Sequence, residues 1–408
     1  MCKQSVILTI LLSAAFAAVP SFAAGYVDSL RVQGENNHVQ GIAYDKEEEC
    51  FYCSFTTAFY KIDRKGRVLA SIDSIHGHLG AMTYDAAARK VYASLECKDD
   101  EIGRGISRGM GRESYSRDES RFYIAVIDVD GMTMETYELP QVREDYLAGR
   151  YGCSGIDGVT LAPKFGPHPG KGRYLYVAYG IYGDTTRTDN DHNILLCYRP
   201  GDFSGPVRRY FIHTGNTTYG VQNLLYDSYT GRMYMAVYRG WKPQYPNYKL
   251  FALDMEQKPS RGRLEGVPYQ KGKVRLLDSF CGWHQGKGST GICSMGDGCY
   301  YVGEPGKADG RQFCDFKLCR RYKIFGLELD WLYVGQVLYL GELIADGLVI
   351  HGLSGESRIS IQPVHRDEVF LPEFRSCAEP VDIDLEDIDL APVRNHIRRN
   401  DNQVIPAG

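Results

Sequence analysis

One pattern recurs five times along the chain, and it constrains the fold more than any other feature of the sequence. Each copy opens with an apolar segment, such as HVQGIAYD at 38–45 or HLGAMTYD at 78–85, and continues through further strand-like runs separated by turn residues. The five openings lie at 38–45, 78–85, 153–160, 219–227 and 289–294. Four strands per unit, at a period of about 40 to 75 residues, are typical of a β-propeller blade.

The repeat therefore predicts an all-β fold, a β-propeller of five four-stranded blades. The run YVDSLRV at 26–32 stands just ahead of the first opening, where a fourth strand stands in the other repeats. We expect this run to complete the last blade and close the ring, because closure removes an open sheet edge. Six blades is the alternative, if the tail supplies another. In the fourth repeat we expect YKLFALD and VRLLDSF to be the last two strands. No helical periodicity is evident before about residue 320.

The two ends of the chain do not carry the repeat. Residues 1–24 combine Lys3, an apolar run and the small-residue site SFA, which is the layout of a secretory signal peptide. We expect a secreted or periplasmic protein with a propeller domain at 25–322 and an atypical C-terminal extension at 323–408. The apolar stretch 324–353 contains four acidic residues, so we do not expect it to span a membrane.

Charge narrows the range of partners. The chain has 47 Lys and Arg against 51 Asp and Glu, a net charge of -4. Without an overall basic field, non-specific binding to nucleic acid loses its main driving force. We expect a monomer that binds a glycan or another small molecule and no nucleic acid.

Several repeat motifs resemble a known group of proteins. The segments HVQGIAYD, SFTTAFYKID, GHLGAMTYD, SLECKDDEIGRGI, YGCSGIDGVT and YVAYGIYGDTTRTDND are similar to motifs of a family of uncharacterised exported bacterial β-propellers. The resemblance covers roughly residues 36–317, and the tail departs from it. It implies the propeller fold and export, and it carries over no activity, so function has to be argued from the site.

Polar residues stand at the start of each repeat, and a propeller brings these positions together. The first strand of every blade lines the central channel, whose mouth forms a funnel suited to ligands. The residues at these positions are His38, Gln40, His76, His78, Ser154, Asp157, Tyr219, Gln222, Asn223, His284, Ser289 and Thr290. One interpretation is structural: these side chains hydrogen-bond to one another and to water in the channel, as buried polar groups must. However, His38 and His78 occupy equivalent places in neighbouring repeats. The formation of a turn does not require histidine, so this repetition favours a functional role.

Three functions are compatible with this set. In a polysaccharide lyase acting on acidic glycans, a histidine removes the proton beside a uronate carboxylate, an amide neutralises that carboxylate, and a tyrosine or histidine protonates the leaving oxygen. His38, His78, Tyr219 and Asn223 are the catalytic candidates. The remaining candidates bind ligand: Gln40, His76, Asp157, Gln222, Trp241, Trp283 and His284.

A glycoside hydrolase and a non-catalytic binding propeller are the two alternatives. A hydrolase usually needs a pair of carboxylates. Asp157 alone lies clearly at the channel mouth, whereas Glu96, Asp184 and Glu304 are distant candidates. A carbohydrate- or protein-binding propeller would instead use aromatic faces such as Trp241 and Trp283 for stacking.

Two loops carry further chemistry. The segment GDTTRTDND at 183–191 contains Asp184, Asp189 and Asp191, oxygen ligands that suit calcium, although the spacing misses the usual calcium-loop pattern. A solvated turn is the alternative. The Gly- and Arg-rich segment 101–112 is expected to be a loop that either caps the funnel or remains a solvated insertion.

Overall fold

The computed structural model describes residues 25–34, 37–168, 170, 172–264, 267, 274–278, 281–284, 287–324, 327–333, 348–352 and 359–363. The predicted signal peptide at 1–24 and most of the predicted extension at 323–408 lie outside the described residues. The chain divides into two units, Val27–Leu318 and a second made of Met1–Tyr26 with Cys319–Gly408.

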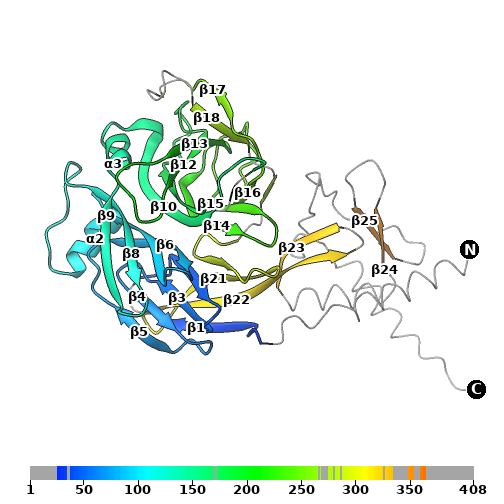
Figure 1. Ribbon diagram of the computed structural model, residues 1–408, viewed down its shortest axis with the longest axis horizontal. Helices are drawn as coiled ribbons and strands as arrows, with labels where there is room; N and C mark the ends of the chain where they lie inside the picture. The colour runs from blue at the N-terminus through cyan, green and yellow to red at the C-terminus, as the bar shows by residue number, and fades with distance from the viewer. Residues whose placement is uncertain are drawn as a thin grey trace, which may run out of the picture. The chain divides into compact units, whose positions relative to one another are not determined.

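Five small sheets arranged in a ring make the first unit a five-bladed β-propeller (Figure 1). Blade one is β2 (Gly41–Asp45), β3 (Cys50–Ser54), β4 (Phe59–Ile62) and β5 (Val68–Ile72). Blade two is β6 (His78–Asp85), β7 (Lys90–Cys97), β8 (Arg121–Asp128) and β9 (Thr133–Glu138). The first strands touch in sequence around the ring, β2 to β6 to β10 to β14 to β20 and back to β2. The predicted fold is confirmed.

Blades three and four depart from the predicted assignment of strands. Blade three contains β10 (Cys153–Ala162), β11 (Tyr174–Ile181), β12 (His192–Tyr198), β13 (Arg208–His213), β18 (Val274–Asp278) and β17 (Ser260–Gly262). Blade four contains β14 (Thr218–Asp227), β15 (Arg232–Tyr238), β16 (Leu250–Asp254) and β19 (Cys281–Trp283). The prediction that VRLLDSF is the fourth strand of blade four was therefore wrong. β18 pairs in parallel with β13 and extends blade three, while the short β19 pairs with β16.

The fifth blade closes the ring as predicted. It consists of β20 (Ile292–Ser294), β21 (Cys299–Ala308), the start of β22 (Arg311–Ile324) and β1 (Ser29–Gln33). Ser29–Gln33 pairs antiparallel with residues 313–317 of β22, and the side chains of Leu30 and Val32 are buried. Hydrogen bonds between the two ends of the propeller thus replace an open edge.

Two short α-helices lie in connections between strands, where no helical periodicity was evident. α2 (Glu101–Gly109) occupies most of the Gly- and Arg-rich segment that was expected to be a loop. The Asp100 carboxylate accepts a hydrogen bond from Gly103 N at 2.7 Å and caps its first turn, a local signal strong enough to begin a helix despite three glycines. α3 (Pro140–Leu147) begins at a proline, and the 3-10 turn η1 (Arg150–Gly152) follows it. No helix in the described part of the chain is long and apolar enough to cross a membrane.

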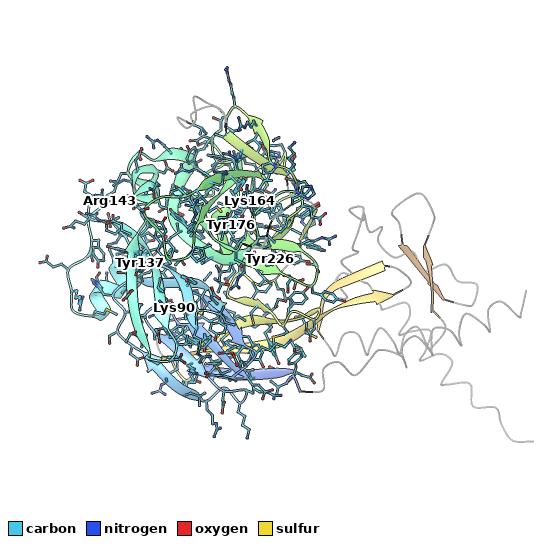
Figure 2. The ribbon with its side chains drawn as sticks, in the orientation of Figure 1. Lys90, Tyr137, Arg143, Lys164, Tyr176 and Tyr226 are labelled. Atoms are coloured by element: carbon cyan, nitrogen blue, oxygen red, sulfur yellow. The ribbon has the colours of Figure 1, made fainter. Side chains whose placement is uncertain are left out.

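The hydrophobic core lies between adjacent blades. Tyr176 of β11, labelled in Figure 2, is fully buried in the cluster that joins blades three and four. Its ring meets Phe165 edge-on at 5.7 Å between centroids. This packing of large apolar side chains fixes each blade against the next and so fixes the first strands around the channel.

In the second unit, β23 (Leu327–Tyr333) pairs antiparallel with the end of β22. A separate hairpin joins β24 (Leu348–Gly352) and β25 (Ile359–Pro363). None of these strands belongs to a sixth four-stranded blade in the part of the chain that the structure describes.

Candidate functional site

Residues from the starts of blades one, three and four meet at the ring centre, at the repeat openings that the sequence singled out. Gln222 Nε2 of blade four donates to Asp157 Oδ2 of blade three at 3.1 Å. Asn223 Nδ2 donates to the carbonyl oxygen of Gln40, just ahead of blade one, at 2.9 Å. The side chains of Gln40 and His38 are 2.9 Å apart at their Nε2 atoms.

Irregular strand pairing places two of these side chains. The register of β10 against β11 shifts between Ile156 and Val159, and that of β14 against β15 shifts between Val221 and Asn223. Asp157 and Gln222 lie inside these shifts. A residue left out of the ladder in this way can turn its side chain toward a site.

A buried ion pair lies beside His78 and was not predicted. Glu96, at the end of β7, is the register partner of His78. Lys98 Nζ lies 2.6 Å from Glu96 Oε2 and donates to the carbonyl oxygen of Ser154 at 2.9 Å. The other carboxylate oxygen of Glu96 accepts from Ile156 N at 2.6 Å. One oxygen of Glu96 therefore accepts a backbone hydrogen bond, and the other makes an ion pair with Lys98.

Glycine makes room for these carboxylates. Gly155 has a φ of +136°, and a Cβ atom there would lie 1.8 Å from Glu96 Oε1. A Cβ at Gly80 would lie 2.4 Å from Ser94 Oγ and 3.3 Å from Asp157 Oδ1. Two of the glycines of the repeat openings thus allow the backbone to approach Glu96 and Asp157 closely.

His78 is a buried side chain whose two ring nitrogens have no hydrogen-bond partner among the described residues. Its exposed fraction is 8%. Nδ1 lies 3.8 Å from Glu96 Oε2, beyond hydrogen-bonding distance. A buried imidazole with both nitrogens unengaged is unusual, and it faces the carboxylates of Glu96 and Asp157.

The two carboxyl groups have pKa values displaced in opposite directions. Burial raises the pKa of Asp157 to about 7, and the Glu96 carboxylate contributes to the rise. Burial by itself would also raise the pKa of Glu96, but the Lys98 ammonium and His78 together hold that pKa below its ordinary value. Burial and the neighbouring His78 lower the pKa of His38. The centre therefore combines an ionised Glu96 with an Asp157 that exchanges its proton near neutral pH.

These side chains could also hold a metal ion. One ligand atom from each of His78, Glu96 and Asp157 lies within 4.8 Å of the others. However, the Lys98 ammonium is already next to Glu96 Oε2 and neutralises it. A divalent cation would have to compete with this buried positive charge, so the set fits proton transfer better than metal binding.

The carboxylates of the predicted calcium loop do not converge. Asp184 accepts from Thr186 and Asp189 from Arg187, whereas Asp191 contacts the ammonium of Lys242. Lys242 is buried, and its Nζ also donates to Asn190 Oδ1 at 2.8 Å. The positive charge that this loop contacts is therefore the ammonium group of Lys242. Calcium binding at the loop stays a prediction.

Four other predicted residues lie outside the central cluster. His76 Nδ1 lies 2.8 Å from the hydroxyl of Tyr115, near α2, and the two groups form a hydrogen bond. The ring of His284 contacts the ring of Tyr248. Trp283 is buried against Tyr234, so it belongs to the blade core and offers no open face for a sugar. Trp241, in contrast, is 58% exposed.

Tyr219 stands at the rim of the cluster. It has a φ of +59° and is 53% exposed, and its ring meets Tyr238 edge-on at 6.2 Å. Its carbonyl oxygen accepts from Gln222 Nε2 at 3.0 Å. The backbone of Tyr219 thus orients Gln222, while its side chain points away toward the surface.

No protein-family model and no curated protein matches the sequence. Among solved structures, the chain is similar at 10% identity to a luciferin-regenerating enzyme, with a TM-score of 0.34 over 67% of this chain and 73% of that one. It is also similar at 10% identity to the soluble aldose sugar dehydrogenase of Escherichia coli in its apo form, with a TM-score of 0.36 over 72% of this chain and 99% of that one. At such low scores these likenesses carry no argument, and the propeller fold rests on the sheets themselves.

Proposed function

We propose that this protein is an acid–base enzyme that acts on acidic glycans by elimination, a polysaccharide lyase. One observation carries the proposal: the buried imidazole of His78, with both nitrogens unengaged, lies beside an Asp157 carboxyl whose pKa is about 7. A base placed beside an acid is what such a reaction needs.

The roles follow from protonation. Neutral His78 takes the proton from the carbon next to the uronate carboxylate. The electron pair of that C–H bond forms a carbon–carbon double bond, and the bond to the glycosidic oxygen breaks. Protonated Asp157 gives its proton to the leaving oxygen. Gln222 holds Asp157 through its amide, and Glu96 and Lys98 act as positioning residues beneath both groups.

Hydrolysis is less well supported, although Glu96 lies nearer to Asp157 than the sequence indicated. Retaining and inverting hydrolases need a second carboxylate that can reach the sugar or a water. Glu96 is 2% exposed and is bound at both oxygens by Lys98 and the Ile156 amide. Asp157 is therefore the one carboxyl of this pair that is free to act on a substrate.

The test is to incubate the mature protein with a panel of plant and host polysaccharides that includes several polyuronides. New reducing ends together with the ultraviolet absorbance of an unsaturated uronide would support the proposal. New ends without that absorbance would overturn it in favour of hydrolysis at Asp157. Retention of a glycan with no product would overturn it in favour of a binding propeller. The predicted export suits an enzyme whose polymeric substrates lie outside the cytoplasm.

A further inference from the structure

We propose that a groove between blades four and five is the subsite for a carboxylate-bearing sugar ring. The inference rests on the proposed function, since it states where the acidic substrate is held. It depends on the juxtaposition of an exposed indole, two cations that have no carboxylate partner among the described residues, and a tyrosine that connects them to the ring centre.

The groove has a volume of about 410 Å³, within the range of small-molecule sites. One wall comes from the end of β15 and the residues after it, and the other from the segment before β20 and from β21. The lining includes Tyr238, Arg239, Trp241, Lys249, Lys287 and Glu304.

Trp241 is a rigid platform in this groove. The guanidinium carbon of Arg239 lies 4.3 Å from the centroid of its ring. At Gly240, between them, a Cβ atom would come within 1.8 Å of the carbonyl oxygen of Asn216, so the turn packs too closely for any other residue. On the far side, buried Lys242 is held by Asn190 and by Asp191. The indole is thus both exposed and fixed, which lowers the entropic cost of stacking a ring on it.

The charge of the groove is positive. Within the described residues, neither Arg239 nor Lys249 has a carboxylate partner, and both are exposed. The acidic residue of the lining, Glu304, is matched by Lys287 at 3.4 Å and by Lys317 at 2.6 Å. Two cations therefore remain to neutralise an anion that enters the groove.

The groove is joined to the ring centre through Tyr238. Tyr238 lines the groove and meets Tyr219 edge-on, and Tyr219 accepts from the Gln222 amide that holds Asp157. Partial burial raises the pKa of Tyr238, and the Asp157 carboxylate raises it further. We therefore expect a glycan bound at the cluster to extend toward this groove.

The ligand class follows from this combination. The apolar face of a pyranose stacks on an indole, and a carboxylate pairs with a guanidinium or ammonium group. A neutral sugar would leave Arg239 and Lys249 without a partner. A uronate ring satisfies both features at once.

The test measures binding by calorimetry in the full-length protein carrying His78→Ala, so that ligand is not consumed. The probes are an oligogalacturonate and its methyl ester, which differ in charge, and a sulfated neutral oligosaccharide. We expect the oligogalacturonate to bind about tenfold or more tightly than its ester, a difference of about 1.4 kcal/mol, and its affinity to fall with salt. Equal affinity for acid and ester, preference for the sulfated sugar, or no binding of the acid would overturn the proposal.

Added variants locate the site. Arg239→Gln should weaken binding of the acid about tenfold and binding of the ester less than about twofold. Trp241→Ala should weaken binding of both ligands about tenfold. Tyr229→Ala is the matched control, because Tyr229 is 55% exposed at the turn at the other end of β14 and should change nothing. If neither Arg239→Gln nor Trp241→Ala changes the affinity for the oligogalacturonate, the proposed subsite is also overturned. Selective binding with no product from the wild type would instead refute only the proposed lyase activity.

Discussion

At the scale of single residues, the stability of the propeller centre depends on a buried pair of opposite charges, Glu96 and Lys98. Glu96 and Lys98 have 1% and 10% of their side chains exposed. Removing one partner of such a pair leaves an uncompensated buried charge, whereas removing both does not. Lys98→Met should therefore lower the free energy of unfolding by about 3–5 kcal/mol, and adding Glu96→Gln should recover most of the loss. Urea denaturation of the two variants checks this, and equal losses in both would contradict it.

The pKa of Asp157 sets the pH dependence. Because Asp157 donates a proton in the proposed reaction and has a pKa of about 7, it is competent below that pH and loses the proton above it. The turnover rate should fall as pH rises through about 7, by about tenfold per pH unit on the alkaline side. Asp157→Asn should lower turnover and abolish this alkaline decline. A wild-type rate that stays flat from neutral to alkaline pH would mean that Asp157 is not the acid.

Part of this cluster could be predicted from the sequence, and part could not. His78, Asp157, Gln222 and Asn223 stand at repeat openings, and the channel of a propeller brings such positions together. Glu96, near the end of a second strand, was predicted to be only a distant candidate. Counting back from the Asp85–Lys90 turn places Cys97 opposite His78, and it is a shift of register between Leu79 and Met82 that brings Glu96 there instead. The shifts of register that turn Asp157 and Gln222 inward leave no mark in hydrophobic periodicity.

At the scale of elements, the inner strands of blades one, two and four each end in an aspartate that accepts hydrogen bonds from the following turn. Asp227 accepts from the amides of Tyr229 and Thr230, from Ser294 Oγ at 2.7 Å and from Tyr300 OH at 2.8 Å. It is fully buried, so its loss leaves several donors without an acceptor.

Asp227→Ala should therefore lower the free energy of unfolding by about 2–3 kcal/mol. Asp278→Ala is the control, because Asp278 ends β18 with an exposed side chain, and it should change stability by less than about 0.5 kcal/mol. Thermal and urea unfolding measure both. A loss at Asp227 no larger than that at Asp278 would show that the turn does not depend on it.

Elements also show why one strand was assigned to the wrong blade. VRLLD has the length and composition of a strand, whereas CGW is short and contains a glycine. Propensity and repeat order therefore favour VRLLD for blade four. In the structure β13 offers an edge that β18 covers, and this long-range pairing cannot be inferred from local pattern.

At the scale of the whole molecule, the ring depends on β1. Val32 is fully buried where β1 pairs with β22, so Val32→Asp should place an unpaired charge in the closing blade. We expect a loss of about 3 kcal/mol or more and a lower melting temperature. Arg31→Ala is the control in the same strand, since Arg31 is exposed and its ion pair with Asp315 lies at the surface, where little stability is gained. A Val32→Asp protein that melts with the wild type would contradict closure by β1.

The central claim, that His78 and Asp157 form the catalytic pair, is tested most directly by comparing variants on the polyuronide that the wild type cleaves. Initial rates of unsaturated-uronide formation would be measured for His78→Ala, Asp157→Asn and the control His168→Ala, an exposed loop histidine. Melting curves would show that each variant is folded. We predict losses of about 10²–10⁴-fold for the two central variants and an unchanged rate for His168→Ala. A folded His78→Ala protein that forms the unsaturated product at the wild-type rate would contradict the account.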